Sequence, residues 1–143
     1  MEKTLATAED LAQEAADFAV SLKPHAATAT LVTLTGDLGA GKTTFVQEVA
    51  KALGVRETIT SPTFVIEKIY PLAHKEFGRL IHIDAYRLKG TRELDVLDWS
   101  EILRDPSNLI FIEWPERIEE AVPQTATVLN FRFIDEQTRA IDK

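Results

Sequence analysis

The stretch that decides the fold is Gly36-Asp37-Leu38-Gly39-Ala40-Gly41-Lys42-Thr43, followed by Thr44. It fits the phosphate-loop pattern G-x-x-x-x-G-K-[ST] without a gap. Glycines readily adopt the conformations that aim successive backbone N–H groups at a phosphate, and the loop leads into a helix N-terminus that favours anions. The pattern predicts that Lys42 reaches the β- and γ-phosphates of a nucleotide. It also predicts that the Thr43 hydroxyl can coordinate Mg²⁺.

The segments around this loop predict strands and helices in alternation. A short run of β-forming residues precedes it at 31–35, and apolar residues at helical spacing follow it at 42–53. Thr7, with Asp10 three residues later, has the pattern of a capping box ahead of a helix at 8–22. The remaining elements are expected as strands at 64–70, 79–84, 109–113, 126–133 and 138–141, and as a further helix at 91–103.

This order of elements predicts the fold class. Alternating strands and helices indicate parallel strands joined by crossover helices, whereas two pairs of closely spaced strands, in 64–84 and in 126–141, are expected to form hairpins. We therefore expect an α/β fold, a small single-domain P-loop NTPase over residues 1–143. Its central sheet should be mixed and mostly parallel, with antiparallel edge strands.

Composition limits the possible functions. The chain has 143 residues, 45% of them hydrophobic, and contains no cysteine, which excludes disulfides and thiolate chemistry. A net charge of −7 with scattered Lys and Arg argues against direct RNA binding, because phosphate neutralisation dominates such affinity. The first residues lack a basic segment followed by an apolar one, and the apolar runs are too short to span a bilayer. The expectation is a cytoplasmic protein without a membrane partner.

Two carboxylates follow apolar strand segments. Leu80-Ile81-His82-Ile83-Asp84 and Leu109-Ile110-Phe111-Ile112-Glu113 each end in an acid. In open parallel sheets ligands bind beyond the carboxyl ends of the strands, where an acid can hold Mg²⁺ or orient an attacking water. The pattern does not divide these tasks between Asp84 and Glu113, and each could also be a solvated acid at a strand end.

Other residues near these acids leave alternatives open. His82 shares a strand face with Asp84 and can either orient it or pack in the core. The hydroxyl-rich stretch Thr60-Ser61-Pro62-Thr63 is either a loop that senses the γ-phosphate or a plain turn. Arg87 can contact a phosphate or pair with an acid, and no residue stands out as an arginine finger supplied by the chain itself.

The two tryptophans have different expected roles. Trp114 follows Glu113 directly, so it can stack on a nucleotide base or pack against the phosphate loop. Trp99 lies on the helix expected at 91–103, which favours a place in the core or at an interface.

Taken in order, four blocks resemble the TsaE (YjeE) family, the P-loop ATPases of bacterial tRNA threonylcarbamoyladenosine biosynthesis. The first block alone indicates only a P-loop NTPase, whereas the four together in so short a chain are specific. The resemblance covers roughly residues 7–116. The blocks are Gly36 to Thr44, Ser61-Pro62-Thr63-Phe64, His82-Ile83-Asp84-Ala85-Tyr86-Arg87 and Glu113-Trp114-Pro115-Glu116.

The resemblance implies ATP, with ADP as product, and Mg²⁺ as ligands. It implies that Lys42, Asp84 and Glu113 are catalytic, that Thr43 and Glu113 hold the metal, and that Asp84 is a second acid near the metal and the γ-phosphate. Ser61, Pro62 and Thr63 would form a switch-like loop. The nucleotide would contact Gly36, Asp37, Leu38, Gly39, Ala40, Gly41, Lys42, Thr43 and Thr44, with Trp114 and Thr7 nearby.

The resemblance also implies a partner, the TsaD–TsaB pair, with tRNA involved only indirectly. ATP hydrolysis would reset that pair between turnovers, and we expect a slow, Mg-dependent ATPase that its partner completes. Two alternatives remain open from the sequence: a small-molecule kinase on a P-loop fold, and a nucleotide-gated scaffold whose hydrolysis is incidental.

Overall fold

The computed structural model describes residues 2–37, 39–55, 67–74 and 76–143. The sheet is built from strands β1 (Glu2–Leu5), β2 (Thr30–Gly36), β3 (Glu67–Pro71), β4 (Arg79–Asp84), β5 (Asn108–Glu113), β6 (Thr127–Phe133) and β7 (Arg139–Asp142). The α-helices are α1 (Ala8–Ser21), α2 (Lys42–Ala52) and α3 (Trp99–Arg104). The 3₁₀ helices are η2 (Ala85–Arg87), η3 (Thr91–Leu97) and η4 (Pro115–Ala121).

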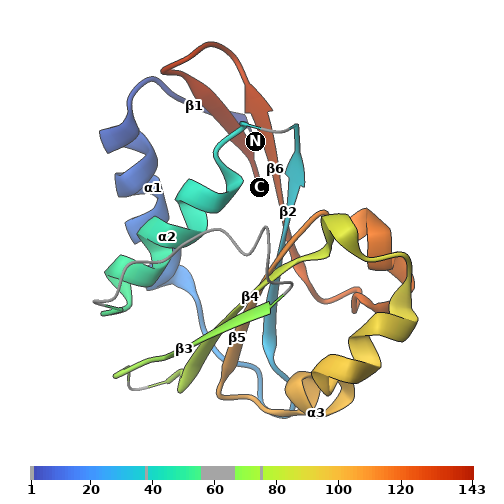
Figure 1. Ribbon diagram of the computed structural model, residues 1–143. Coiled ribbons are helices and arrows are strands. Elements are labelled where there is room, and N and C mark those ends of the chain that lie inside the picture. Colours follow the sequence, from blue (N-terminus) through green and yellow to red (C-terminus); the bar gives the residue numbers. More distant parts are fainter. Residues whose placement is uncertain (1, 38, 56–66, 75) are drawn as a thin grey trace.

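The strands form one sheet in the order β1-β7-β6-β2-β5-β4-β3 (Figure 1). The central strands β6, β2, β5 and β4 are parallel to their neighbours. Antiparallel pairing joins β3 to β4 at one edge, and β6 to β7 and β7 to β1 at the other. The expected α/β fold, with a mostly parallel centre and antiparallel edges, is confirmed. Both expected hairpins are present.

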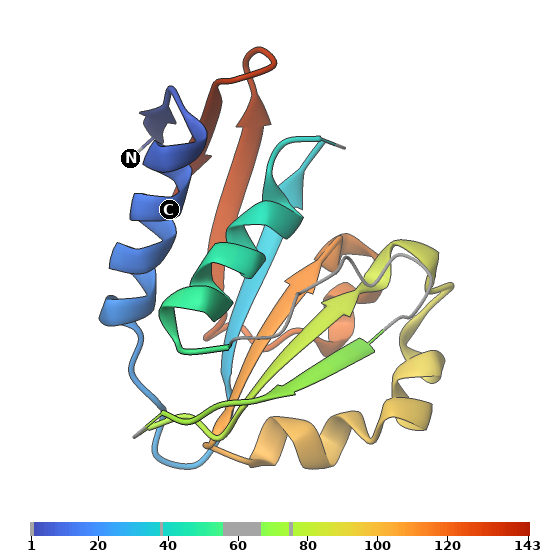
Figure 2. The same cartoon turned by 60° about the vertical axis from the view of Figure 1, so that its left-hand side comes forward.

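Two layers cover the sheet, as the two views show (Figures 1 and 2). Helices α1 and α2 lie side by side over one face, and Phe45, Phe111 and Leu129 belong to the core beneath them. Elements η3, α3 and η4 cover the other face, where Ile110 and Trp99 are among the buried residues. Trp99 lies in the core, one of the two places that the sequence left open, and its indole N–H donates to the Ala121 carbonyl at 3.2 Å. The helix layers hold β2 and β5 between them.

Local sequence signals set the ends of the first two helices. The Thr7 hydroxyl accepts from the Asp10 backbone N–H at 3.1 Å, and the Asp10 carboxylate accepts from the Thr7 N–H at 3.2 Å. This reciprocal capping box starts α1 where the sequence predicted. After α2, Gly54 takes a φ of +95°, a left-handed conformation that ends the helix.

The single helix expected at 91–103 is wrong. The chain forms η3, breaks at Asp98 with a φ of +56°, and restarts as α3. Leu94 and Trp99 are both buried, yet residues five apart point to different sides of a straight α-helix. A break at Asp98 lets both side chains face the sheet.

Strand β1 and element η4 were not predicted from the sequence. Strand β1 is short and pairs only with β7, at the far end of the chain, in a register that places Lys3 opposite Ile141. Element η4 begins at Pro115, and proline is preorganised for the first turn of a helix. The first residues of the strand expected at 64–70 lie outside the described part, and its remainder is β3.

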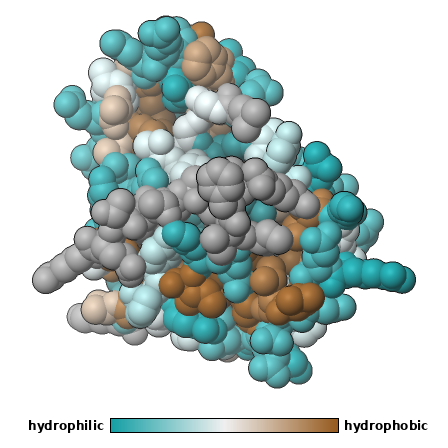
Figure 3. Space-filling view, viewed as in Figure 1, coloured by the Kyte–Doolittle hydropathy of each residue, from teal (hydrophilic) through white to brown (hydrophobic). Residues whose placement is uncertain are grey.

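Hydrophilic residues predominate on the face shown in Figure 3, and small apolar areas lie both near its upper end and in its lower half. Within the residues that the structure describes, none of the helices is both long and apolar enough to cross a bilayer.

Candidate nucleotide and metal site

The glycine loop runs from the end of β2 to the start of α2. Gly36 has a φ of +135° and Gly41 a φ of +99°, conformations that side-chain-bearing residues rarely adopt. At Gly36 an added Cβ would lie 2.3 Å from the Phe131 carbonyl oxygen, so only glycine fits there. Gly41 provides no side-chain cap for α2, which leaves the first helical N–H groups for another acceptor. The loop therefore has the backbone of an anion site.

Lys42 is almost fully buried beside this loop, with 4% of its surface exposed. Its ammonium donates to the Gly36 carbonyl at 2.6 Å and lies 3.7 Å from the centre of the Trp114 indole ring. Within the described part of the chain, no carboxylate lies close enough to form an ion pair with it. An anionic ligand would supply the counter-charge that this buried cation lacks.

The environment of Lys42 lowers the pKa of its ammonium group. Burial lowers the pKa of the ammonium below its ordinary value of 10.5, and the more distant carboxylates of Glu113, Glu116, Asp84 and Asp37 offset only part of that effect. Those acids raise the local negative potential without touching Nζ. The charged lysine is thus held at a cost in a place where a phosphate would stabilise it.

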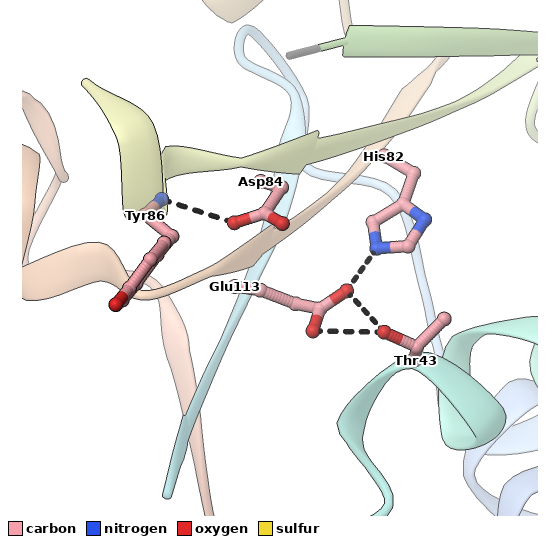
Figure 4. Close-up of polar contacts among 5 residues, drawn as sticks. All are labelled: Thr43, His82, Asp84, Tyr86 and Glu113. Carbon is pink, nitrogen blue, oxygen red and sulfur yellow. Dashed lines mark hydrogen bonds and ion pairs between the residues drawn. The ribbon is translucent and has the colours of Figure 1, made fainter. Parts of the chain in front are cut away.

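Thr43 and Glu113 bring their oxygens together at the carboxyl end of the central strand β5 (Figure 4). The Thr43 hydroxyl lies 3.0 Å from Oε1 and 2.9 Å from Oε2 of Glu113. Thr43 lies in the first turn of α2 and Glu113 at the end of β5, next to β2. Hydroxyl and carboxylate oxygens are the hard ligands that Mg²⁺ prefers, so the donor set fits this metal.

Any metal here would depend on few protein atoms. Among the described residues, no cluster of three or more His, Asp or Glu side chains is arranged to hold a metal ion. Mg²⁺ keeps several waters and is commonly held by one or two protein oxygens together with substrate phosphates. The pair Thr43 and Glu113 is consistent with that kind of site.

His82 contacts Glu113, and not Asp84 as one reading of the strand face suggested. Its Nε2 lies 2.6 Å from Oε2 of Glu113, and the imidazole is fully buried. Asp84 lies beside Glu113 in the register of β4 and β5. Its carboxylate accepts from the Tyr86 backbone N–H at 3.0 Å and thereby caps η2 (Figure 4). The two strand-end acids thus have different surroundings, which periodicity could not reveal.

Trp114 packs on the loop lysine, one of the two roles that the sequence left open. It has a φ of +60°, and its ring centre lies 5.0 Å from that of Tyr86. The Arg117 guanidinium lies 5.3 Å from the centre of the Tyr86 ring. A continuous stack therefore runs from Lys42 through the two rings to the exposed Arg117.

A pocket of about 490 Å³ lies on the other side of the loop, between the start of α1 and the hairpin of β6 and β7. Thr7, Gly41 and Thr44, all predicted near the nucleotide, line it together. Sequence reasoning missed the residues of the hairpin, Glu136, Gln137 and Arg139. The parallel pairing of β6 with β2 brings that hairpin to the loop, and this topology was the only available signal.

Some predicted site residues lie outside the part of the chain that the structure describes. Ser61, Pro62 and Thr63, the expected switch-like loop, and Leu38 of the glycine loop lie outside the described residues, and so does the side chain of Arg87. Their assigned roles stay predictions.

A phosphate-loop sequence between a central parallel strand and the following helix, with an acid at the end of the neighbouring strand, defines a P-loop-type α/β protein. The family model described as "Threonylcarbamoyl adenosine biosynthesis protein TsaE" matches residues 2–141. The chain belongs to the TsaE family. The resemblance carried by the four sequence blocks is thereby confirmed, and with it a family role in tRNA threonylcarbamoyladenosine biosynthesis.

Individual relatives agree with this assignment. The tRNA threonylcarbamoyladenosine biosynthesis protein TsaE of Streptomyces coelicolor is 46% identical over 92 residues, which are 63% of this chain and 60% of that protein. The protein of the same name from Rickettsia bellii is 37% identical over 123 residues, 85% of this chain and 79% of its own. The crystal structure of YdiB from Bacillus subtilis aligns with a TM-score of 0.72 and 30% identity over 99% of this chain and 82% of that one.

Proposed function

We propose that this protein binds and hydrolyses ATP with Mg²⁺ and thereby serves the TsaD–TsaB pair in tRNA threonylcarbamoyladenosine modification. The observation that carries the proposal is the start of α2. There Lys42 turns its buried ammonium to the Gly36 carbonyl while the adjacent Thr43 faces Glu113. This arrangement offers a cation and free helix N–H groups at the start of α2, and two hard oxygen ligands, one from α2 and one from the end of β5.

Each residue has a task in this proposal. Lys42 leaves the Gly36 carbonyl to neutralise phosphate oxygens, and Thr43 with Glu113 holds the metal. When bound, Mg²⁺ supplies charge neutralisation on the β- and γ-phosphates. Asp84, at the end of the neighbouring strand, orients the attacking water. The pocket lined by Thr7, Thr44 and Arg139 accepts the nucleoside end of ATP.

Slow turnover in isolation is part of the proposal. Catalysis of phosphoryl transfer gains a large share of its rate from an arginine that neutralises the developing charge, supplied by the chain or by a partner. Among the described side chains, no arginine contacts Lys42, Thr43 or Glu113. The net charge of −7 supports a role in which the partner, and not this chain, holds the tRNA. The pathway and the composition fit a cytoplasmic protein.

The experiment is titration calorimetry of the purified protein with ATP in Mg²⁺ and in EDTA, followed by phosphate release. We expect Mg²⁺ to tighten binding and turnover to be slow but measurable. Thr43→Val and Glu113→Gln should each remove the gain from Mg²⁺. Absence of ATP binding in both buffers would contradict the proposal.

Two outcomes would replace the ATPase role. Transfer of the γ-phosphoryl group to a metabolite instead of water would identify a small-molecule kinase. If Asp84→Asn and Glu113→Gln bind ATP without hydrolysing it and still support tRNA modification, the protein is a nucleotide-gated scaffold.

A further inference from the structure

The observation behind this inference is the buried contact between His82 and Glu113. The imidazole has no exposed surface, and its Nε2 lies 2.6 Å from Oε2 of Glu113. Glu113 is itself 4% exposed. A bond this short between two buried groups fixes the carboxylate with respect to strand β4.

The other ring nitrogen, Nδ1, makes a buried histidine at this position costly. Within the described part of the chain, Nδ1 of His82 is buried without a hydrogen-bond partner. An unpaired buried acceptor costs about 1–3 kcal/mol, whereas an apolar side chain of similar size would cost nothing of this kind. Packing alone is therefore a poor reason for a histidine at this position.

The hydrogen bonds to Glu113 define what His82 adds. Of the described side chains, only Thr43 and His82 hydrogen-bond to the Glu113 carboxylate. Under the proposed function the Thr43 hydroxyl also serves the metal, which leaves His82 as the donor with no second task. Hydrogen-bond partners of metal-ligating carboxylates hold the ligand in its binding orientation.

We infer that His82 is a positioning residue, which donates from Nε2 to hold the Glu113 carboxylate toward Thr43 so that both can bind Mg²⁺. This inference rests on the proposed metal site and assigns His82 no contact with substrate. His82 acts through Glu113, so it should affect metal binding and leave nucleotide binding without metal unchanged.

A pair of amide variants tests the contact. In His82→Gln the amide nitrogen can occupy the place of Nε2, whereas in His82→Asn it lies where Nδ1 was. Both side chains are polar amides, so burial costs are matched. Calorimetry would use a non-hydrolysable ATP analogue in Mg²⁺ and in EDTA, with His25→Asn at an exposed position as control.

In His82→Asn we expect the gain in affinity from Mg²⁺ to fall about 10- to 100-fold. Binding in EDTA should match the unsubstituted protein, and His82→Gln should recover most of the gain. An unchanged gain in His82→Asn would overturn the inference and leave the proposed function intact. An unsubstituted protein with no gain from Mg²⁺ would overturn the proposed metal site, and the inference with it.

A second measurement needs no variant and covers the case in which His82→Asn fails to fold. Nitrogen-15 NMR of the unsubstituted protein reports which ring nitrogen of His82 carries a proton. We expect a proton on Nε2. An unprotonated Nε2 could not donate to the carboxylate and would overturn the inference alone.

Discussion

At the scale of single residues, the burial of the Lys42 ammonium favours the binding of an anion. Its ammonium is buried against a carbonyl and an indole ring, without a carboxylate within ion-pair distance among the described residues. Removing a charge from water without a counter-charge costs free energy. A bound phosphate supplies the missing counter-charge, so the burial of Lys42 raises the affinity of the folded chain for a nucleotide.

Lys42→Met should raise the free energy of unfolding by about 1 kcal/mol and abolish ATP binding. Methionine keeps the apolar stem against Trp114 and removes only the buried charge. Chemical denaturation and calorimetry on the same samples check both effects. A Met variant that is less stable than the parent protein would show that the ammonium stabilises the fold.

The same variant should show a definite pH dependence. Burial lowers the pKa of Lys42 in the folded state below its ordinary 10.5. As pH rises through that lowered value, the folded chain releases a proton that the unfolded chain keeps, so folding becomes more favourable. The stability advantage of Lys42→Met is therefore greatest at neutral pH and shrinks as pH approaches 10.5. A constant difference across this range would contradict the burial argument.

At the scale of elements, the glycine loop depends on contacts that differ between its glycines. Gly36→Ala places a Cβ against the Phe131 carbonyl in addition to the strain of a positive φ, so it should cost about 3 kcal/mol or more. Gly39→Ala is the matched control, because its φ is +78° but nothing lies within 4 Å of the added Cβ. It should cost about 1 kcal/mol. Equal losses in urea denaturation would contradict this assignment of close contact.

The sequence predicted elements well where the signal was local. The loop, the capping box at Thr7 and the strand-end acids were all found, because each depends on neighbouring residues. The break at Asp98 was missed because burial of both Leu94 and Trp99 requires the sheet beneath them. Strand β1 was missed because it pairs with β7, far along the chain.

The candidate site was predicted in the same uneven way. Lys42, Thr43 and Glu113 follow from motif and strand end. The partner of His82 does not, since periodicity gives the face of a strand but not which side chain of the next strand is within reach. The pocket residues Gln137 and Arg139 belong to a hairpin that only the parallel pairing of β6 with β2 brings to the loop.

At the scale of the whole molecule, Glu14 joins both ends of the chain to α1. This buried carboxylate pairs with Lys3 of β1 and with Lys143 after β7. Burial raises the pKa of Glu14, but the hydrogen bonds from Lys143 and Lys3 outweigh it and leave the pKa below 4.5. The two termini also lie near each other in Figure 1. These ion pairs hold the antiparallel edge of the sheet against α1, and the β6–β7 hairpin that lines the pocket belongs to that edge.

Glu14→Gln should lower the free energy of unfolding by about 1 kcal/mol at neutral pH. Because the folded-state pKa is lowered, this contribution is present above 4.5 and is lost as pH falls through the folded value. The variant and the parent should therefore converge in acid. Glu2→Gln, which breaks an exposed pair with Arg132, is the control and should change stability much less than Glu14→Gln does. Equal effects of both substitutions in urea denaturation would contradict a special role for Glu14.

The central claim concerns the protein together with its proposed partners. The most direct measurement is the rate of ATP hydrolysis by the purified protein, alone and then with a TsaD–TsaB pair and tRNA, in parallel with Lys42→Ala. We predict slow turnover alone and strong stimulation by the complex, with both lost in the variant. Rapid turnover that the complex leaves unchanged would contradict the account.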